Sequence, residues 1–150
     1  MSTVQLAFSP DPAYVRTVRL VAAAVARRAG VSDEILDEVR LAIGEACTRA
    51  VALHRRHNLT DPIDVLMSDG GRFVVRVTDR GPPESAKNPG ETTTDIIAQV
   101  AAETGRHPDD EYVLGLTLLT ALVHDLTVAA APDGLGTEVR MSWPLNRRGH

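Results

Sequence analysis

The sequence has a single cysteine, no surplus of positive charge and no long apolar run, and each of these absences excludes a class of protein. The 150 residues carry a net charge of -4 with a pI near 5.7, which gives no basic footprint for nucleic acid. The one cysteine, Cys47, cannot form a disulfide within the chain, so the framework of a small secreted domain is excluded. We expect its thiol to be buried and unreactive, because it stands among small apolar residues.

Neither a membrane span nor a signal peptide is indicated. The apolar runs fall far short of the about 20 residues that cross a bilayer. The opening MSTVQLAFSP has no basic start followed by an apolar stretch. We therefore expect a cytoplasmic protein whose partners are proteins or small molecules, with no direct contact to nucleic acid or membrane.

Length and composition predict one compact domain. Hydrophobic residues make up 43% and charged residues 24% of the chain, which are ordinary values for globular proteins. A chain of this length buries about 70% of the surface that its unfolded form exposes. We predict a single domain over residues 1–145, followed by a solvated tail, NRRGH, at 146–150.

The first half of the sequence predicts a strand followed by two helices. Val4, Leu6 and Phe8 alternate with polar or small residues, as in a half-buried strand. A helix is expected to begin after Asp11 and to end at Gly30. Ser32, two residues on, is expected to cap a second helix, which ends before the turn-rich NLTDP. The apolar residues of each helix form one stripe: Val15, Val18, Ala22, Val25 and Ala29 in the first, and Ile35, Val39, Ala42, Ala46, Ala50 and Leu53 in the second.

The second half predicts two hairpins and a long connection. Residues 63–67 and 73–77 alternate on either side of an Asp-Gly-Gly turn. Residues 80–94 are rich in Pro, Gly and small polar residues, so this connection is either functional or disordered. A short helix at 95–104 and an apolar helix, YVLGLTLLTALVHD, follow it. LTVAAA and TEVRMSW, joined by PDGLG, form the last hairpin.

This order of elements predicts an α+β fold. Five mostly antiparallel strands would be covered on one face by three helices, because both strand pairs are hairpins and each long helix has one apolar stripe. The result is a two-layer sandwich. No internal repeat or second domain is visible in the sequence.

Four motifs, spread over nearly the whole chain, carry a resemblance to a known family. They are LDEVRLAIGEACTRAVALH on the second helix, VTDRGPP at the end of a hairpin strand, LGLTLLTALVHDLTV on the last long helix and GTEVRMSWP in the final strand. In this order and spacing they resemble the anti-sigma factor and serine-protein kinase branch of the GHKL (histidine-kinase-like) ATPases. The resemblance implies the Bergerat-type ATPase fold, a two-layer sandwich of the predicted kind.

The second helix is the site helix in that family. There it carries Glu-Ala-x-Thr-Asn-Ala, in which the Glu acts as general base and the Asn holds the magnesium that bridges the nucleotide phosphates. This sequence keeps Glu45, Ala46 and Thr48 but has Arg49 in place of the Asn. A guanidinium has donors and no acceptor, so it cannot ligate a metal. The resemblance therefore implies Glu45 as the catalytic residue and leaves no assigned metal ligand.

The adenine motifs are kept in part. The family's Asp-x-Gly-x-Gly, whose Asp accepts a hydrogen bond from the adenine amino group, is matched by Asp79 and Gly81, with Pro83 in place of the second Gly. Proline has no backbone N–H and a fixed φ. Thr137 matches the threonine that lines the adenine pocket.

The glycine-rich lid over the phosphates is expected at 111–116, where only Gly115 remains. With so few glycines, this segment is poorly suited to bind phosphates through its backbone N–H groups. We expect ATP or ADP to bind weakly or not at all, and the need for magnesium is left open. The resemblance implies a nucleotide site formed by Glu45, Arg49, Asp79, Gly81, Gly115 and Thr137.

Simpler roles are open for the same residues. Glu45 and Arg49 can form an i,i+4 ion pair on the helix, worth about 0.3 to 0.5 kcal/mol if exposed. Arg49 can also neutralise the base, or meet phosphates in place of the metal. Asp79 can be a turn residue, and Gly115 can permit close helix packing.

Histidines and arginines elsewhere are assigned to the surface. The five histidines have no metal-ligand spacing and are expected to be exposed: His54, His57, His107, His124 and His150. The arginines of the first helix form a solvated face or, by extension from the family, a partner contact. These are Arg16, Arg19, Arg27 and Arg28.

The resemblance implies an anti-sigma factor that acts by partner switching. Such a protein binds a sigma factor and is released by an anti-anti-sigma protein of the STAS type, on which the family's kinases phosphorylate a serine. The loss at Arg49 predicts weakened or lost kinase chemistry. An active serine-protein kinase is the alternative, and the ATPase domain of a sensor histidine kinase is disfavoured, since no preceding helix carries a phospho-acceptor His.

We expect a homodimer or a complex with the antagonist, because the first strand is a sheet edge in the family.

Overall fold

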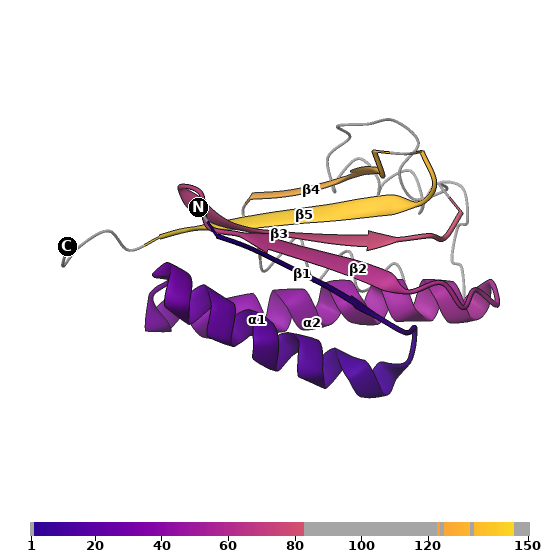
Figure 1. The fold of residues 1–150 in the computed structure, drawn as a ribbon, viewed down its shortest axis with the longest axis horizontal. Helices are drawn as coiled ribbons and strands as arrows, with labels where there is room; N and C mark the ends of the chain where they lie inside the picture. Colours follow the sequence, from indigo (N-terminus) through magenta and orange to yellow (C-terminus); the bar gives the residue numbers. More distant parts are fainter. Residues whose placement is uncertain (1, 83–122, 124, 133, 146–150) are drawn as a thin grey trace.

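The computed structural model describes residues 2–82, 123, 125–132 and 134–145, which form a sheet layer and a helix layer (Figure 1). The elements, in chain order, are strand β1 (Thr3–Phe8), the 3-10 helix η1 (Pro12–Tyr14), helices α1 (Val15–Ala29) and α2 (Asp33–Arg56), and strands β2 (Ile63–Ser68), β3 (Arg72–Asp79), β4 (Asp125–Ala130) and β5 (Thr137–Pro144).

The five strands form one sheet in the order β1-β2-β3-β5-β4, and every neighbouring pair is antiparallel. The predicted fold class is therefore confirmed, including both hairpins. β1 lies at one edge of the sheet, as expected, and β4 lies at the other.

Both described helices cover the same face of the sheet (Figure 1). The predicted helix at 95–104 lies outside the described residues. So does the segment YVLGLTLLTALVHD apart from Val123 and Asp125, and Asp125 already begins β4. In the part of the chain that the structure describes, no helix combines the length and apolar character needed to cross a bilayer.

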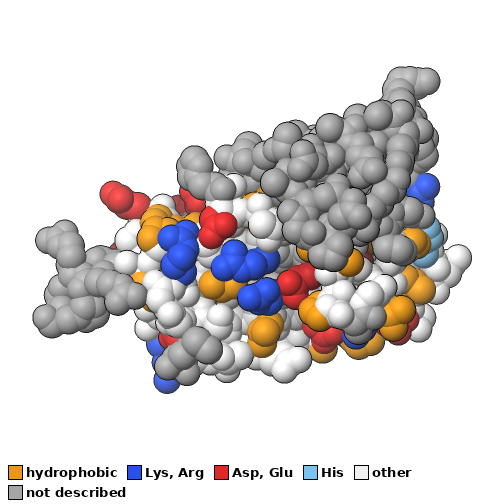
Figure 2. Space-filling model, turned by 90° about the horizontal axis from the view of Figure 1, so that it is seen from above, with side chains coloured by type: hydrophobic (Ala, Val, Ile, Leu, Met, Phe, Trp, Pro, Cys, Tyr) orange, Lys and Arg blue, Asp and Glu red, His pale blue; other side chains and the backbone are white. Residues whose placement is uncertain are grey.

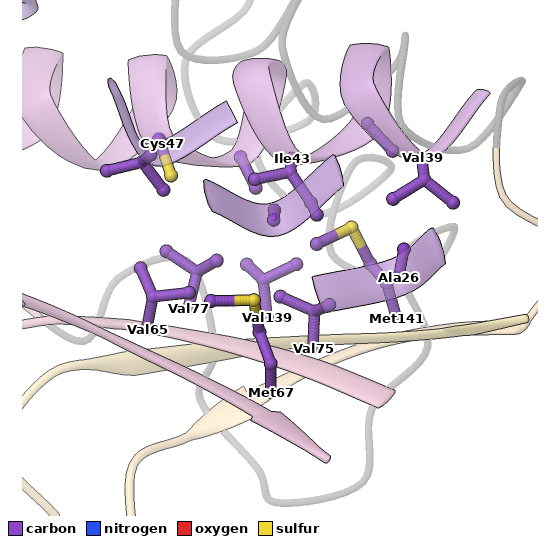
Figure 3. Packing of buried hydrophobic residues seen from close by; sticks show 14 of the residues in the cluster. Ala26, Val39, Ile43, Cys47, Val65, Met67, Val75, Val77, Val139 and Met141 are labelled. Atoms are coloured by element: carbon purple, nitrogen blue, oxygen red, sulfur yellow. The ribbon is translucent and has the colours of Figure 1, made fainter. Parts of the chain in front are cut away.

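The core lies between the helices and the sheet, and α1 contributes Val18, Ala22 and Ala26 to it (Figure 3). Full burial of one large aliphatic or Met side chain stabilises a fold by about 1.5 to 3 kcal/mol. Cys47 is part of this core, and burial raises the pKa of its thiol to about 12. The thiol therefore stays protonated and unreactive, as predicted. The side chains that meet here are Val39, Ile43 and Cys47 of α2 and Val65, Met67, Val75, Val77, Val139 and Met141 of the sheet.

The helix ends agree with the predicted caps in part. The carboxylate of Asp11 accepts a hydrogen bond from the N–H of Ala13 at 2.9 Å, and the first turn after it is the 3-10 helix η1. Gly30 ends α1 with a left-handed φ of 107°. Ser32 occupies the N-cap position of α2, but its side chain makes no capping hydrogen bond; its carbonyl oxygen instead accepts from the N–H of Ile35.

Charged side chains of both signs lie side by side on the sheet face turned away from the helices (Figure 2). Arg76 and Glu138 are 3.1 Å apart, and Arg140 lies 3.7 Å from Asp125. A hydrogen bond from the Ser142 hydroxyl, together with nearby arginines, lowers the pKa of Asp125. Exposed pairs of this kind add little stability, and among the described residues positive and negative side chains alternate on this face.

Candidate functional site

A buried ion pair between Arg49 and Asp79 forms the centre of the site. Nη1 of Arg49 donates to Oδ2 of Asp79 at 2.9 Å, and neither side chain has any solvent exposure. The two residues are 30 positions apart in the chain and meet because α2 packs against β3. Arginine and aspartate are almost never fully buried unless they are paired, so each accounts for the burial of the other.

The turn after β3 holds the Asp79 side chain in place. Its second oxygen, Oδ1, accepts a hydrogen bond from the N–H of Gly81 at 2.9 Å. A Cβ on Gly81 would lie 2.4 Å from Cδ2 of Leu53, and a Cβ on Gly136, which has a φ of 114°, would lie 1.9 Å from the carbonyl oxygen of Asp79. Gly136 is therefore required where the backbone of Asp79 approaches it, whereas a side chain at position 81 would have to displace Leu53.

The structure gathers three more of the predicted site residues around Asp79. Thr137 is buried and is the Cα partner of Asp79 across β3 and β5. Gly81 belongs to the turn, and Arg49 to the ion pair. Glu45, one helical turn before Arg49, is only partly buried. Within the described ranges no ion pair joins Glu45 to Arg49. Gly115 lies outside the described residues.

His54 corrects the expectation that the histidines are surface residues. Its side chain is fully buried, with Nδ1 3.1 Å from the carbonyl oxygen of Asp61 and Nε2 accepting the N–H of Arg80 at 2.8 Å. Burial lowers the pKa of His54, against the opposite effect of the Asp79 charge. The other described histidine, His57, is partly exposed.

A magnesium nucleotide does not fit these residues in the way that the resemblance implies. Arg49 stands at the position of the metal ligand and has no lone pair to offer a cation. Asp79 already accepts one hydrogen bond on each oxygen, and water does not reach its side chain. An adenine amino group that bound Asp79 would have to share its oxygens with Arg49 and the N–H of Gly81, or replace them.

A groove of about 1050 Å³ lies between α1 and α2, away from the ion pair. No acidic side chain is among the described residues that line it, and five arginines are. Leu20, which is 62% exposed, adds an apolar surface. Of the arginines predicted on the first helix, Arg27 and Arg28 lie in its last turn, outside the groove. The arginines of the groove are Arg16, Arg19, Arg40, Arg55 and Arg56.

The sequence is similar to known proteins over most of its length. Residues 8–143 match the family described as Histidine kinase-like ATPase domain. The chain is also 28% identical to the serine-protein kinase RsbW of Bacillus pumilus (strain SAFR-032) over 158 residues, which cover 96% of this chain and 86% of that protein. The matched range of the family includes all six predicted site residues.

Proposed function

Because the chain belongs to the histidine kinase-like ATPase domain family, we propose that it is an anti-sigma factor that acts by partner switching, with weakened or lost ATP-dependent kinase chemistry. In this proposal one domain over residues 1–145 binds a sigma factor in the cytoplasm and is released by a STAS-type anti-anti-sigma protein. The similarity to a serine-protein kinase over most of both chains supports the assignment to this branch.

The ion pair between Arg49 and Asp79 is the observation that carries the proposal. Membership of an ATPase family implies a nucleotide pocket, and here the residue at the metal position is bonded to the residue at the adenine position. Leaving one charge of a buried pair unpartnered costs about 3 to 5 kcal/mol. At about 1.4 kcal/mol per tenfold, a ligand that must separate the pair loses a factor of about 100 or more in affinity.

Kinase chemistry needs more than the fold. Phosphoryl transfer depends on positioning and on electrostatic stabilisation by a metal ion, and Arg49 supplies no ligand for one. Glu45 keeps the position of the general base and remains partly exposed. A general base at Glu45 does not by itself supply the metal-dependent positioning that phosphoryl transfer requires.

Partner binding needs only the fold and its surface, and the arginine groove supports such a role. One of the five arginines, Arg40, is paired with Asp37. The guanidinium groups that line the groove from both helices still favour an acidic ligand, in a chain whose net charge is -4. Arginine forms bidentate bonds with carboxylates. We assign the groove to a protein segment with acidic residues, on the sigma factor or its antagonist, and expect a homodimer or a heterocomplex.

The experiment that tests the proposed function combines both partners. A candidate sigma factor and its STAS antagonist are mixed with the protein, ATP and Mg²⁺, and both complexes and phosphoserine on the antagonist are measured. We expect complexes without phosphorylation. Phosphorylation by the unmodified protein that Glu45→Ala abolishes would instead establish the alternative, an active serine-protein kinase.

A further inference from the structure

We propose that His54 is a positioning residue, which fixes the turn from Asp79 to Gly81 and so directs the Asp79 carboxylate toward Arg49. Its relevance to ligand binding rests on the proposed function, in which Asp79 belongs to the nucleotide pocket. The positioning itself depends only on hydrogen bonds within the chain.

The two ring nitrogens of His54 have partners that define its protonation state. The backbone N–H of Arg80 can only donate, so Nε2, 2.8 Å away, carries no proton. The carbonyl oxygen of Asp61 can only accept, so Nδ1, 3.1 Å away, carries the proton. The ring is therefore neutral and fully hydrogen-bonded. It joins the end of α2 to the segment before β2 and to the residue that follows β3.

The bond to Arg80 lies at the centre of the turn. The amide of Arg80 stands between Asp79, whose carboxylate reaches Arg49, and Gly81, whose N–H binds that same carboxylate. With this amide fixed by His54, the peptide planes of the turn have little freedom. Without the Nε2 acceptor, a backbone N–H that is bonded inside the protein would lose its partner, which is costly.

Charged groups on three segments surround the ring. The carboxylates of Asp79 and Asp61 favour its protonation, and the guanidinium of Arg49 opposes it together with burial. A proton on Nε2 would remove the acceptor for the N–H of Arg80. The neutral ring is therefore the form that holds the turn.

Two substitutions separate the bonds that His54 makes. The side-chain amide of a glutamine reaches about as far as Nε2 and can still accept the N–H of Arg80, whereas that of an asparagine reaches only about as far as Nδ1. Hydrogen exchange at the Arg80 amide is the readout. We expect His54→Asn to speed exchange at least about tenfold, the factor that corresponds to one lost hydrogen bond, and His54→Gln to speed it less. His57→Gln is the matched control and should leave it unchanged.

The tautomer of His54 and the coupling between His54 and Arg49 can also be measured. Imidazole ¹⁵N shifts of the unmodified protein should show the proton on Nδ1, and a proton on Nε2 at neutral pH would overturn the proposal even if the variants fail to fold. Unfolding of His54→Asn, Arg49→Met and the double variant should be non-additive, because both residues act through Asp79. Additive effects, or equal exchange in the Asn and Gln variants, would also contradict it.

Nucleotide binding distinguishes this proposal from the proposed function. ATP is titrated into Arg49→Asn, alone and combined with His54→Asn or His54→Gln. Weaker binding with the Asn than with the Gln substitution would extend the positioning role to the ligand. If Arg49→Asn binds no ATP while the tautomer and the coupling are as expected, the nucleotide pocket is refuted and the positioning role of His54 stands.

Discussion

Nη1 of Arg49 lies 2.9 Å from Oδ2 of Asp79, inside a part of the protein that water does not reach. The resemblance to GHKL ATPases assigns these two positions to a magnesium ion and to adenine. Here the two side chains bind each other, so a nucleotide that used both positions as the family does would have to compete with this ion pair.

The ion pair should behave as a coupled unit in unfolding experiments. Arg49→Met and Asp79→Asn should each lower the free energy of unfolding by about 3 to 5 kcal/mol, because each leaves a buried charge unpaired. The double variant should cost clearly less than the sum of the two. Urea denaturation measures all three, and Arg76→Met, at a partly exposed pair, should cost less than about 1 kcal/mol. Additive costs at Arg49 and Asp79 would contradict the pairing.

The fold should lose stability in mild acid because of His54. Its pKa is lowered in the folded protein, so the unfolded chain takes up the proton more readily. The contribution of the neutral ring is complete above the unfolded pKa of about 6.5 and declines as the pH falls from there toward the lower folded pKa. Denaturation between about pH 7.5 and 5.5 should show a steeper loss for the unmodified protein than for His54→Gln. Equal slopes would count against this assignment, and His57→Gln should keep the original slope.

Gly136 should tolerate alanine much less well than Gly134, although both have a left-handed φ. An added Cβ at 134 meets nothing within 4 Å, whereas at 136 it would lie 1.9 Å from the carbonyl oxygen of Asp79. Gly134→Ala should cost about 1 to 2 kcal/mol from backbone strain alone. Gly136→Ala should cost distinctly more and should disturb the turn after β3. Thermal unfolding compares the two, and equal costs would show that the close approach is relieved easily.

The arginine groove should bind an acidic partner in a salt-dependent manner. Arg16 and Arg55 are exposed and line it from α1 and α2. Reversing both charges, in Arg16→Glu/Arg55→Glu, should weaken binding of the sigma factor or the antagonist by at least about tenfold, or about 1.4 kcal/mol. Calorimetry at two salt concentrations is the measurement. Arg27→Glu, on α1 but outside the groove, is the control, and equal losses from both substitutions would remove the groove from the interface.

Periodicity in the sequence was sufficient to predict the described secondary structure, because alternation and helical spacing report which face of an element is buried. It placed Asp79 at the end of one strand and Thr137 at the start of another, and the pairing of these two strands in the sheet brings the two residues together. The motifs also marked Glu45 and Arg49 as neighbours on one helix. These predictions depend only on residues that are close together in the sequence.

The partners of Arg49 and His54 could not be predicted in the same way. Helical spacing predicted Glu45, one turn away, as the ion-pair partner of Arg49. Its actual bond to Asp79 depends on where α2 crosses the sheet. The ring of His54 binds two backbone groups, and backbone groups leave no signal in side-chain composition. One signal was available, because His54 lies four residues after Ala50 and so continues the apolar stripe of α2.

Calorimetric titration of ATP, with and without Mg²⁺, into the unmodified protein and into Arg49→Asn shows whether the ion pair between Arg49 and Asp79 weakens nucleotide binding. The unmodified protein should bind ATP weakly and with little dependence on Mg²⁺. Arg49→Asn should bind it more tightly, because Asp79 is released and an oxygen ligand for the metal returns; circular dichroism would confirm that this variant is folded. Tight, strictly Mg²⁺-dependent binding by the unmodified protein would show that the ion pair opens readily and that another residue holds the metal.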